Sequence, residues 1–164
     1  MMAKIPKSGK PDSPEAGFAE AALLEGEDGV LRCYIRNCKR NALYSESLDR
    51  GLTWSEPSLT GIASWLSPLH FLRLADGRML LTAARRGRNR RDVFALVGDR
   101  NGTYQSFGEA KDIVLNKQTK GGDFGYASTA QNADGSLVTV FYAHPESDST
   151  KPAAVYACRW ALGH

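Results

Sequence analysis

Residues 47–54 read Ser-Leu-Asp-Arg-Gly-Leu-Thr-Trp, and this stretch, of the form S-x-D-x-G-x-T-W, decides the fold. The side-chain oxygens of Ser47 and Asp49 can hydrogen-bond within a turn. Gly51 can take a positive φ that other residues avoid. Trp54 can bury its ring against neighbouring strands. The pattern therefore predicts a closed turn that joins two β-strands.

A weaker copy of this motif lies 50 residues later, at 97–104, which read Val-Gly-Asp-Arg-Asn-Gly-Thr-Tyr. Val97 replaces the serine, so one hydrogen bond of the turn is lost. Asn101 replaces the glycine and is expected in the left-handed conformation, which asparagine tolerates. Tyr104 replaces the tryptophan. Two copies at this spacing predict a repeated β-unit.

The dipeptide Asp-Gly marks the same repeat. It occurs at 28–29, 76–77 and 134–135, with steps of 48 and 58 residues, and each time it enters an apolar run. Asp-Gly between short apolar runs is a hairpin signal, because glycine accepts the positive φ of a primed turn. A period near 40–60 residues without helical periodicity is typical of β-propeller blades.

The repeat predicts an all-β fold of about three four-stranded antiparallel blades, with little helix. The middle unit is the clearest, with strands expected at 69–74, 78–83, 92–97 and near 112–115. The flanking units repeat the second and third strands, at 30–35 and 42–47 and at 136–142 and 153–160. The last unit lacks both the S-x-D-x-G-x-T-W motif and an obvious fourth strand. The predicted organisation is a flexible segment at 1–16, then blades at about 17–64, 65–118 and 119–164.

The composition fits one globular domain of 164 residues, with 42% hydrophobic and 24% charged residues. No apolar run is long enough to span a membrane, so no membrane partner is expected. The net charge of +3 is too small to indicate nucleic-acid binding. The arginine-rich run at 85–91 has no interleaved aromatic residues, so no nucleic-acid partner is expected from it either.

The three cysteines, Cys33, Cys38 and Cys158, do not form a disulfide framework. Cys33 and Cys38 lack a second ligand pair at zinc spacing, so they are interpreted as free thiols, and no metal or other cofactor is expected. The first ten residues are basic but have no apolar core, so they do not fit a signal peptide. The compartment stays unknown and a cytoplasmic location is the default, although a fragment of a secreted protein would also lack its signal.

Strand direction predicts where a binding site lies. In antiparallel blades the Asp-Gly turns and the S-x-D-x-G-x-T-W turns share one end of the sheets. The loops between second and third strands share the opposite end with the starts of the first strands. Loops on a rigid scaffold usually carry function, so the opposite end is expected to hold the site.

Four side chains are predicted at that opposite end. Glu20 and Tyr126 each lie eight residues before an Asp-Gly pair, at equivalent positions of the first and third blades. Arg36 and Arg86 each lie 11 residues before an S-x-D-x-G-x-T-W motif or its copy, in the first and second blades. Arg90 competes with Arg86 for a ligand-binding role. The alternative for each of these residues is structural: solvated charges and a packing aromatic ring.

These motifs resemble the sialidase (neuraminidase) superfamily. Residues 47–54 look like its Asp-box, the bacterial neuraminidase repeat. Residues 20–36 look like its pattern of a glutamate before and an arginine after Asp-Gly, and 125–142 look like the last blade that holds its catalytic tyrosine. The likeness covers roughly residues 17–160 and matches the C-terminal half of a six-bladed propeller. The resemblance implies a sialidase-like β-propeller present as an incomplete ring.

The resemblance also implies an exo-α-sialidase type of glycoside hydrolase module that hydrolyses terminal sialic acids. Tyr126 would be the catalytic nucleophile and Glu20 the base that activates it, the tyrosine nucleophile being an exception among glycosidases. Arg36 and Arg86, with Arg90 as the competitor, would bind the carboxylate of a sialylated or related acidic glycan. The family's acid/base aspartate and a further arginine come from N-terminal blades that this sequence lacks. The module is therefore expected to be incomplete as an enzyme on its own.

Two questions stay open at this point. Departures from the family pattern at Val97, Asn101 and Ala127 favour a non-catalytic glycan-binding or structural propeller as the alternative function. Three blades cannot close a ring, and an open arc would expose apolar patches and sheet edges. Either the chain is part of a longer protein, or two copies form a homodimer that closes the propeller.

Overall fold

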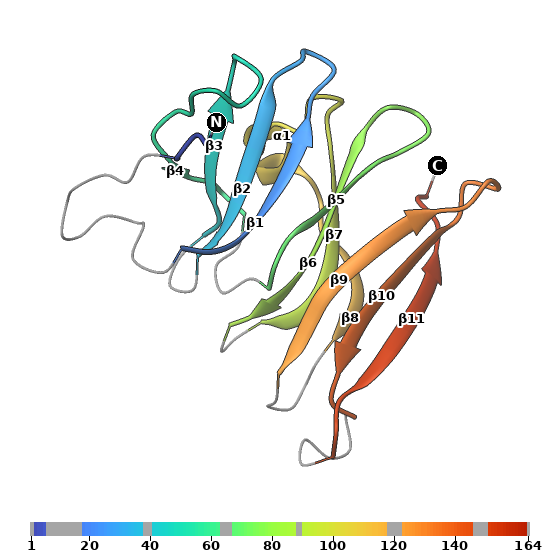
Figure 1. Ribbon diagram of the computed structural model, residues 1–164. Coiled ribbons are helices and arrows are strands. Elements are labelled where there is room, and N and C mark those ends of the chain that lie inside the picture. Colours follow the sequence, from blue (N-terminus) through green and yellow to red (C-terminus); the bar gives the residue numbers. More distant parts are fainter. Residues whose placement is uncertain are drawn as a thin grey trace.

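Three antiparallel β-sheets follow one another along the chain in the computed structural model (Figure 1). The structure describes residues 2–5, 18–37, 41–62, 67–87, 90–117, 123–145 and 151–163. The sheets stand side by side as an arc rather than a closed ring. The all-β prediction of partial propeller blades is confirmed.

Each sheet is a meander of consecutive strands. The first contains β1 (Phe18–Glu25), β2 (Leu31–Asn37), β3 (Leu43–Ser47) and β4 (Ser58–Leu59). The second contains β5 (His70–Arg73), β6 (Met79–Arg86), β7 (Arg91–Gly98) and β8 (Ile113–Lys117). The third contains β9 (Phe124–Gln131), β10 (Leu137–Ala143) and β11 (Ala154–Trp160). The third sheet therefore has three strands rather than four, and no strand follows β11 within residues 161–163.

A short helix, α1 (Tyr104–Glu109), lies between β7 and β8, in a fold for which the sequence predicted little helix. Thr103 caps its N-terminus, with the side chain accepting a hydrogen bond from the Ser106 amide. Phe107 lies on its buried side and joins the core between the first two sheets. A helix of six residues is too short to give a periodic signal in the sequence, so its stability comes from the cap and from Phe107.

The three Asp-Gly turns share one geometry, which differs from the primed turn that the sequence predicted. Gly29, Gly77 and Gly135 have φ values of +75, +90 and +83. Among the described residues only two non-glycine residues have positive φ, and neither lies in these turns. In the first turn the Gly26 amide donates to the Val30 carbonyl at 3.0 Å. Each turn is therefore a three-residue loop that ends in a left-handed glycine.

The first S-x-D-x-G-x-T-W turn closes through its own side chains. Asp49 Oδ1 accepts from the Ser47 hydroxyl and the Thr53 amide, both at 2.8 Å, and Asp49 Oδ2 accepts from the Thr53 hydroxyl at 2.6 Å. The Gly51 amide donates to the Ser47 hydroxyl at 2.8 Å. Hydrogen bonds from Thr53 lower the pKa of Asp49 to about 2. The Trp54 ring packs beside the outer face of the first sheet, as expected.

The second copy of the motif keeps the aspartate–threonine pair but changes the turn. Thr103 donates to Asp99 from its amide at 3.0 Å and from its hydroxyl at 2.7 Å. The expectation that Asn101 is left-handed is wrong, because Gly102 takes the positive φ of +63 one position later. The Asn101 side chain instead accepts a hydrogen bond from the Asp28 amide at 3.1 Å. It thus links the second sheet to the first Asp-Gly turn.

Gly102 lies at a close approach of the first two sheets, and its replacement by alanine is expected to destabilise the fold. A Cβ there would lie 2.9 Å from a methyl of Leu24 and 3.2 Å from Met79 Cγ, on a backbone with positive φ. We expect a loss of about 2 kcal/mol in the free energy of unfolding, measured by urea denaturation. Gly108→Ala is the control, because a Cβ there meets nothing within 4 Å and alanine favours the helix. Equal stability of the two variants would contradict this account.

Buried side chains pack the sheets face to face and fix the inner strands as neighbours. Tyr34 and Tyr44 of the first sheet pack with Leu81, Phe94 and Phe107 of the second unit. On its other face the second sheet packs against the third through the buried residues Ala84, Val93, Phe124, Ala127, Phe141 and Ala143. As a result β5 contacts both β1 and β9. The start of β9 is thereby brought toward the start of β1, which is far away in sequence.

Some predictions concern the termini and the cysteines. Of the segment 1–16 only residues 2–5 are described, and Ile5 packs against the cluster of Cys33, Ile35 and Leu43. Cys33 and Cys158 are free thiols, and Cys38 lies outside the described residues. Within the described ranges no helix has the length and apolar character needed to cross a membrane. The described His, Cys, Asp and Glu side chains form no group of three or more suited to a metal ion.

Candidate functional site

Three of the predicted site residues meet at the end of the sheets where β1 and β9 begin. The Tyr126 hydroxyl donates to Glu20 Oε1 at 2.9 Å, across a separation of 106 residues in the chain. Arg36 Nη1 donates to both oxygens of the same carboxylate, at 3.0 and 2.9 Å. Glu20 lies near the start of β1, Arg36 near the end of β2 and Tyr126 near the start of β9. The repeat equivalences and strand directions placed these three side chains at the same end of the sheets, and in the structure they contact one another.

The backbone at Tyr126 is strained in a way that directs its side chain. Its φ is +53, which is rare for an aromatic residue, and the preceding Gly125 has φ +130. The pairing of β9 with β10 shifts here, so that Tyr126 and Ala127 stand opposite Phe141 alone. This is a β-bulge, a device that re-aims a side chain. Such strain clusters at functional sites, where the surrounding structure maintains it.

The electrostatic surroundings of Glu20 keep it ionised. A hydrogen bond from backbone amide at Glu20, then those from the Tyr126 hydroxyl and from Arg36, lower the pKa of the Glu20 carboxyl below its ordinary value, against the opposing effect of burial. A carboxylate held in this form is a hydrogen-bond acceptor for the Tyr126 hydroxyl at neutral pH. The pair therefore has the geometry of a hydroxyl nucleophile and its proton acceptor.

Arg86 lies beside Tyr126 and holds several acceptors. Its Nε donates to the Phe124 carbonyl at 2.6 Å, its Nη1 pairs with Asp123 Oδ1 at 2.8 Å, and its Nη2 donates to the Tyr142 hydroxyl at 3.1 Å. The Tyr142 hydroxyl donates in turn to Asp123 Oδ2. The Arg86 guanidinium carbon is 5.9 Å from the centroid of the Tyr126 ring.

We call these residues together the Tyr126 cluster: Glu20, Arg36, Arg86, Asp123, Tyr126 and Tyr142. Two of its members, Asp123 and Tyr142, were not singled out from the sequence. For Tyr142 a signal exists, because it lies eight residues after the aspartate of Asp134-Gly135, as Arg36 does after that of Asp28-Gly29. For Asp123 the sequence offers no comparable signal, because it precedes the regular repeat.

Arg90 belongs to a different set of contacts. It pairs with Asp92 at 3.0 Å and with Asp112 at 2.7 Å. Arg85 pairs with the same two carboxylates, at 2.6 and 2.9 Å, and its guanidinium carbon lies 3.7 Å from the centre of the Phe94 ring. Arg85 and Asp92 are buried. Of the two competing arginines, the structure brings Arg86 rather than Arg90 into contact with the Tyr126 cluster.

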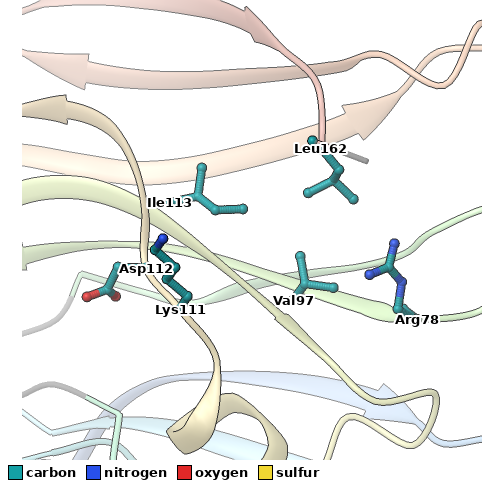
Figure 2. Close-up of a pocket in the computed structure, with 7 residues that line it drawn as sticks. Arg78, Val97, Lys111, Asp112, Ile113 and Leu162 are labelled. Carbon is teal, nitrogen blue, oxygen red and sulfur yellow. The ribbon is translucent and has the colours of Figure 1, made fainter.

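A separate pocket lies between the second sheet and the C-terminal segment (Figure 2). It has a volume of about 650 Å³ and is lined by Arg78, Val97, Lys111, Asp112, Ile113, Leu162 and Gly163. In Figure 2 the apolar side chains of Val97, Ile113 and Leu162 stand between the charged groups at its two ends. Arg78 is paired with Asp76 at 2.6 Å. None of the residues predicted from the sequence as a site lines this pocket.

The chain matches a family model described as a BNR repeat-like domain over residues 6–139. No curated protein matches it. A Dyadobacter fermentans protein of unknown function aligns with TM-score 0.75 and 24% identity, over 87% of this chain and 37% of that one. A thermostable family-43 glycoside hydrolase aligns with TM-score 0.60 and 13% identity, over 88% of this chain and 48% of that one. The intramolecular trans-sialidase from Ruminococcus gnavus, solved with oseltamivir carboxylate, aligns with TM-score 0.55 and 20% identity, over 89% of this chain and 33% of that one.

The identity to each of these solved structures is below 25%, so the comparisons establish the fold, and any argument about activity depends on the residues of the site. The chain spans less than half the length of each of these three proteins. The family model, in contrast, covers most of the chain, including both copies of the turn motif and the first two sheets. On this match and on its partial-propeller architecture, the chain belongs to the family of BNR repeat-like domains, with a sialidase-like fold.

Proposed function

We propose that this chain is a sialidase-like glycoside hydrolase module of the exo-α-sialidase type, which binds a terminal sialic acid or a related acidic sugar at the Tyr126 cluster. The observation that carries the proposal is the 2.9 Å hydrogen bond from the Tyr126 hydroxyl to Glu20, flanked by Arg36 and Arg86. The fold supports it, because solved structures of similar architecture include a glycoside hydrolase and a trans-sialidase.

The chemistry suits a sugar whose anomeric carbon carries a carboxylate. A neutral tyrosine hydroxyl can approach such a carbon, whereas a carboxylate nucleophile would be repelled. In the proposed step a bond forms between the Tyr126 oxygen and the anomeric carbon. The glycosidic C–O bond breaks, with its electron pair going to the departing oxygen. The Tyr126 proton passes to Glu20 Oε1, and water later releases the sugar from the tyrosine.

The departing oxygen needs a proton donor, which the family resemblance assigns to an aspartate outside this sequence. The arginines would orient the sugar carboxylate through charge-assisted hydrogen bonds. Arg36 also holds the Glu20 carboxylate, and thereby keeps the proton acceptor facing Tyr126. We therefore propose that the chain supplies the nucleophile, its base and two carboxylate-binding arginines, and needs other residues for turnover.

A non-catalytic glycan-binding role is the second candidate. It is favoured by the departures from the family pattern at Val97, Asn101 and Ala127. The two functions differ in a simple assay. A fluorogenic sialoside reports cleavage, and saturation-transfer NMR with N-acetylneuraminate reports binding. The assay is made on an assembly that also supplies the missing proton donor. Binding with turnover there supports the hydrolase module, binding without turnover there supports the second candidate, and absence of both contradicts an acidic-sugar site.

We also propose that two copies of the chain pair into a homodimer that closes the propeller. The outer face of the third sheet exposes Val140 and Val155 on neighbouring strands, with 77% of Val155 accessible, and the first sheet exposes Leu23. Light scattering on a sizing column should give twice the chain mass of 17.9 kDa. Val155→Asp should then shift the mass to that of one chain, while Leu48→Asp, at an exposed turn, should not. A monomeric wild-type protein would exclude closure by pairing.

A further inference from the structure

The Asp123 carboxylate pairs with the Arg86 guanidinium at a position where a ligand carboxylate could bind. We infer that Asp123 is a specificity-determining residue: it is an internal carboxylate that an acidic ligand must displace from Arg86 before that arginine can bind it. The inference rests on the proposed function, because it concerns how an acidic sugar reaches the Tyr126 cluster.

The argument begins with the donors of Arg86. A guanidinium binds a carboxylate in two parallel hydrogen bonds, through either Nη1 with Nη2 or Nε with Nη2. Nη1 pairs with Asp123 at 2.8 Å, Nη2 donates to the Tyr142 hydroxyl at 3.1 Å, and Nε donates to the Phe124 carbonyl at 2.6 Å. Both pairs of donors, Nη1 with Nη2 and Nε with Nη2, therefore already donate to acceptors of the protein.

These acceptors differ in how easily they can leave. The Phe124 carbonyl belongs to the backbone of β9, and the Phe124 side chain is buried between the sheets. Tyr142 is half-buried and its ring packs 5.7 Å from that of Tyr126. The Asp123 side chain is 62% exposed, against 19% for Arg86. Asp123 is thus the acceptor that can rotate into water, and an ion pair with so exposed a partner is weak.

The charge of Asp123 also selects among ligands. A ligand carboxylate placed on Arg86 while Asp123 remains would put two anions on one guanidinium, which is unfavourable at such short range. A neutral sugar meets no such repulsion, and its hydroxyls can donate to the Asp123 carboxylate. Asp123 therefore lowers the affinity for acidic ligands relative to neutral ones. Its removal should reverse that preference.

Tyr142 offers a readout that needs no ligand. Burial and, after it, the hydrogen bond to Asp123 raise the pKa of the Tyr142 hydroxyl to about 12. Without the Asp123 carboxylate, the phenolate form is no longer disfavoured by that neighbour, while Arg86 still favours it. The pKa of Tyr142 should fall when Asp123 is replaced.

The test compares Asp123→Ala with Glu27→Ala in the full chain. Glu27 is a matched control, because it is also an exposed carboxylate paired with an arginine, Arg100, but lies in the first Asp-Gly turn. Acetate and its neutral analogue acetamide are titrated against the NMR signal of Arg86 Nε–H, followed by N-acetylneuraminate. We expect Asp123→Ala to bind acetate about tenfold more tightly, from the loss of one exposed ion pair and one like-charge contact. Acetamide binding and the Glu27→Ala variant should stay unchanged.

Each outcome decides the inference. A gain for acetate with a lower pKa of Tyr142, both confined to Asp123→Ala, supports it. An unchanged affinity for acetate, or an unchanged pKa of Tyr142, overturns the inference, whether or not N-acetylneuraminate binds. If acetate gains but neither protein binds N-acetylneuraminate, the role of Asp123 is supported and the proposed substrate is contradicted.

Discussion

Replacing Tyr126 with phenylalanine should lower kcat for sialoside cleavage by about a thousandfold or more, in whichever assembly of the chain performs cleavage. Phenylalanine cannot form the bond to the anomeric carbon and cannot donate a proton to Glu20. It keeps the ring, so the contact with Tyr142 at 5.7 Å and the bulge in β9 are retained. Binding of N-acetylneuraminate should therefore change little, and the loss should appear in kcat.

The matched control is Tyr156→Phe. Tyr156 lies on β11 and stacks on Phe141, with centroids 5.9 Å apart, so this variant also removes one tyrosine hydroxyl from the third sheet. It should cleave at the wild-type rate. Wild-type turnover by Tyr126→Phe would exclude Tyr126 as the nucleophile and would leave the cluster as a binding site. Glu20→Gln should lower kcat as well, because it removes the proton acceptor.

The fold was readable from the sequence because its signals are local. Apolar runs between Asp-Gly pairs placed the strands of the middle unit, and β5 to β8 lie within a few residues of those predictions. Of the two features that the sequence missed, one has a local cause and the other a tertiary cause. Gly102 follows Asn101 directly and relieves it of the left-handed conformation. Helix α1 depends on the burial of Phe107 against another sheet, which the sequence of one segment does not display.

Only those site residues that occupy repeated positions in the blades could be predicted from the sequence. Glu20, Arg36 and Tyr126 occupy repeated positions, so equivalence between blades placed them at one end, and the structure adds their contacts. The sequence could not decide between Arg86 and Arg90, because an arginine at or after the end of a strand carries no sign of its partners. Buried Asp92 draws Arg90 and Arg85 to one side of the second sheet, and Asp123 draws Arg86 to the other. Such pairing depends on residues that become neighbours only after folding.

The buried ion pair of the second sheet should give the largest effect on stability. The Asp92 and Arg85 side chains are each 5% exposed and lie 2.6 Å apart. Asp92→Asn should lower the free energy of unfolding by about 3 kcal/mol, because breaking a buried pair leaves an uncompensated charge. Arginine cannot lose its proton to relieve that charge. Asp112 would then be the one remaining carboxylate that pairs with both Arg85 and Arg90 in this group, so one positive charge would stay uncompensated.

Asp134→Asn is the matched control for this prediction, measured in the same urea denaturation series. Asp134 pairs with Arg159 at 2.7 Å, but both side chains are more than half exposed, so water solvates the charge that remains. Asp134→Asn should lower the free energy of unfolding by no more than about 1 kcal/mol. Asparagine can still accept the Ser136 amide hydrogen bond of the Asp-Gly turn, so the turn itself is preserved. If both variants lost equal stability, the Arg85–Asp92 pair would be no more buried in solution than the surface pair. The separation of Arg90 from the ligand site would then lose its structural basis, because that separation depends on Asp92 holding both arginines.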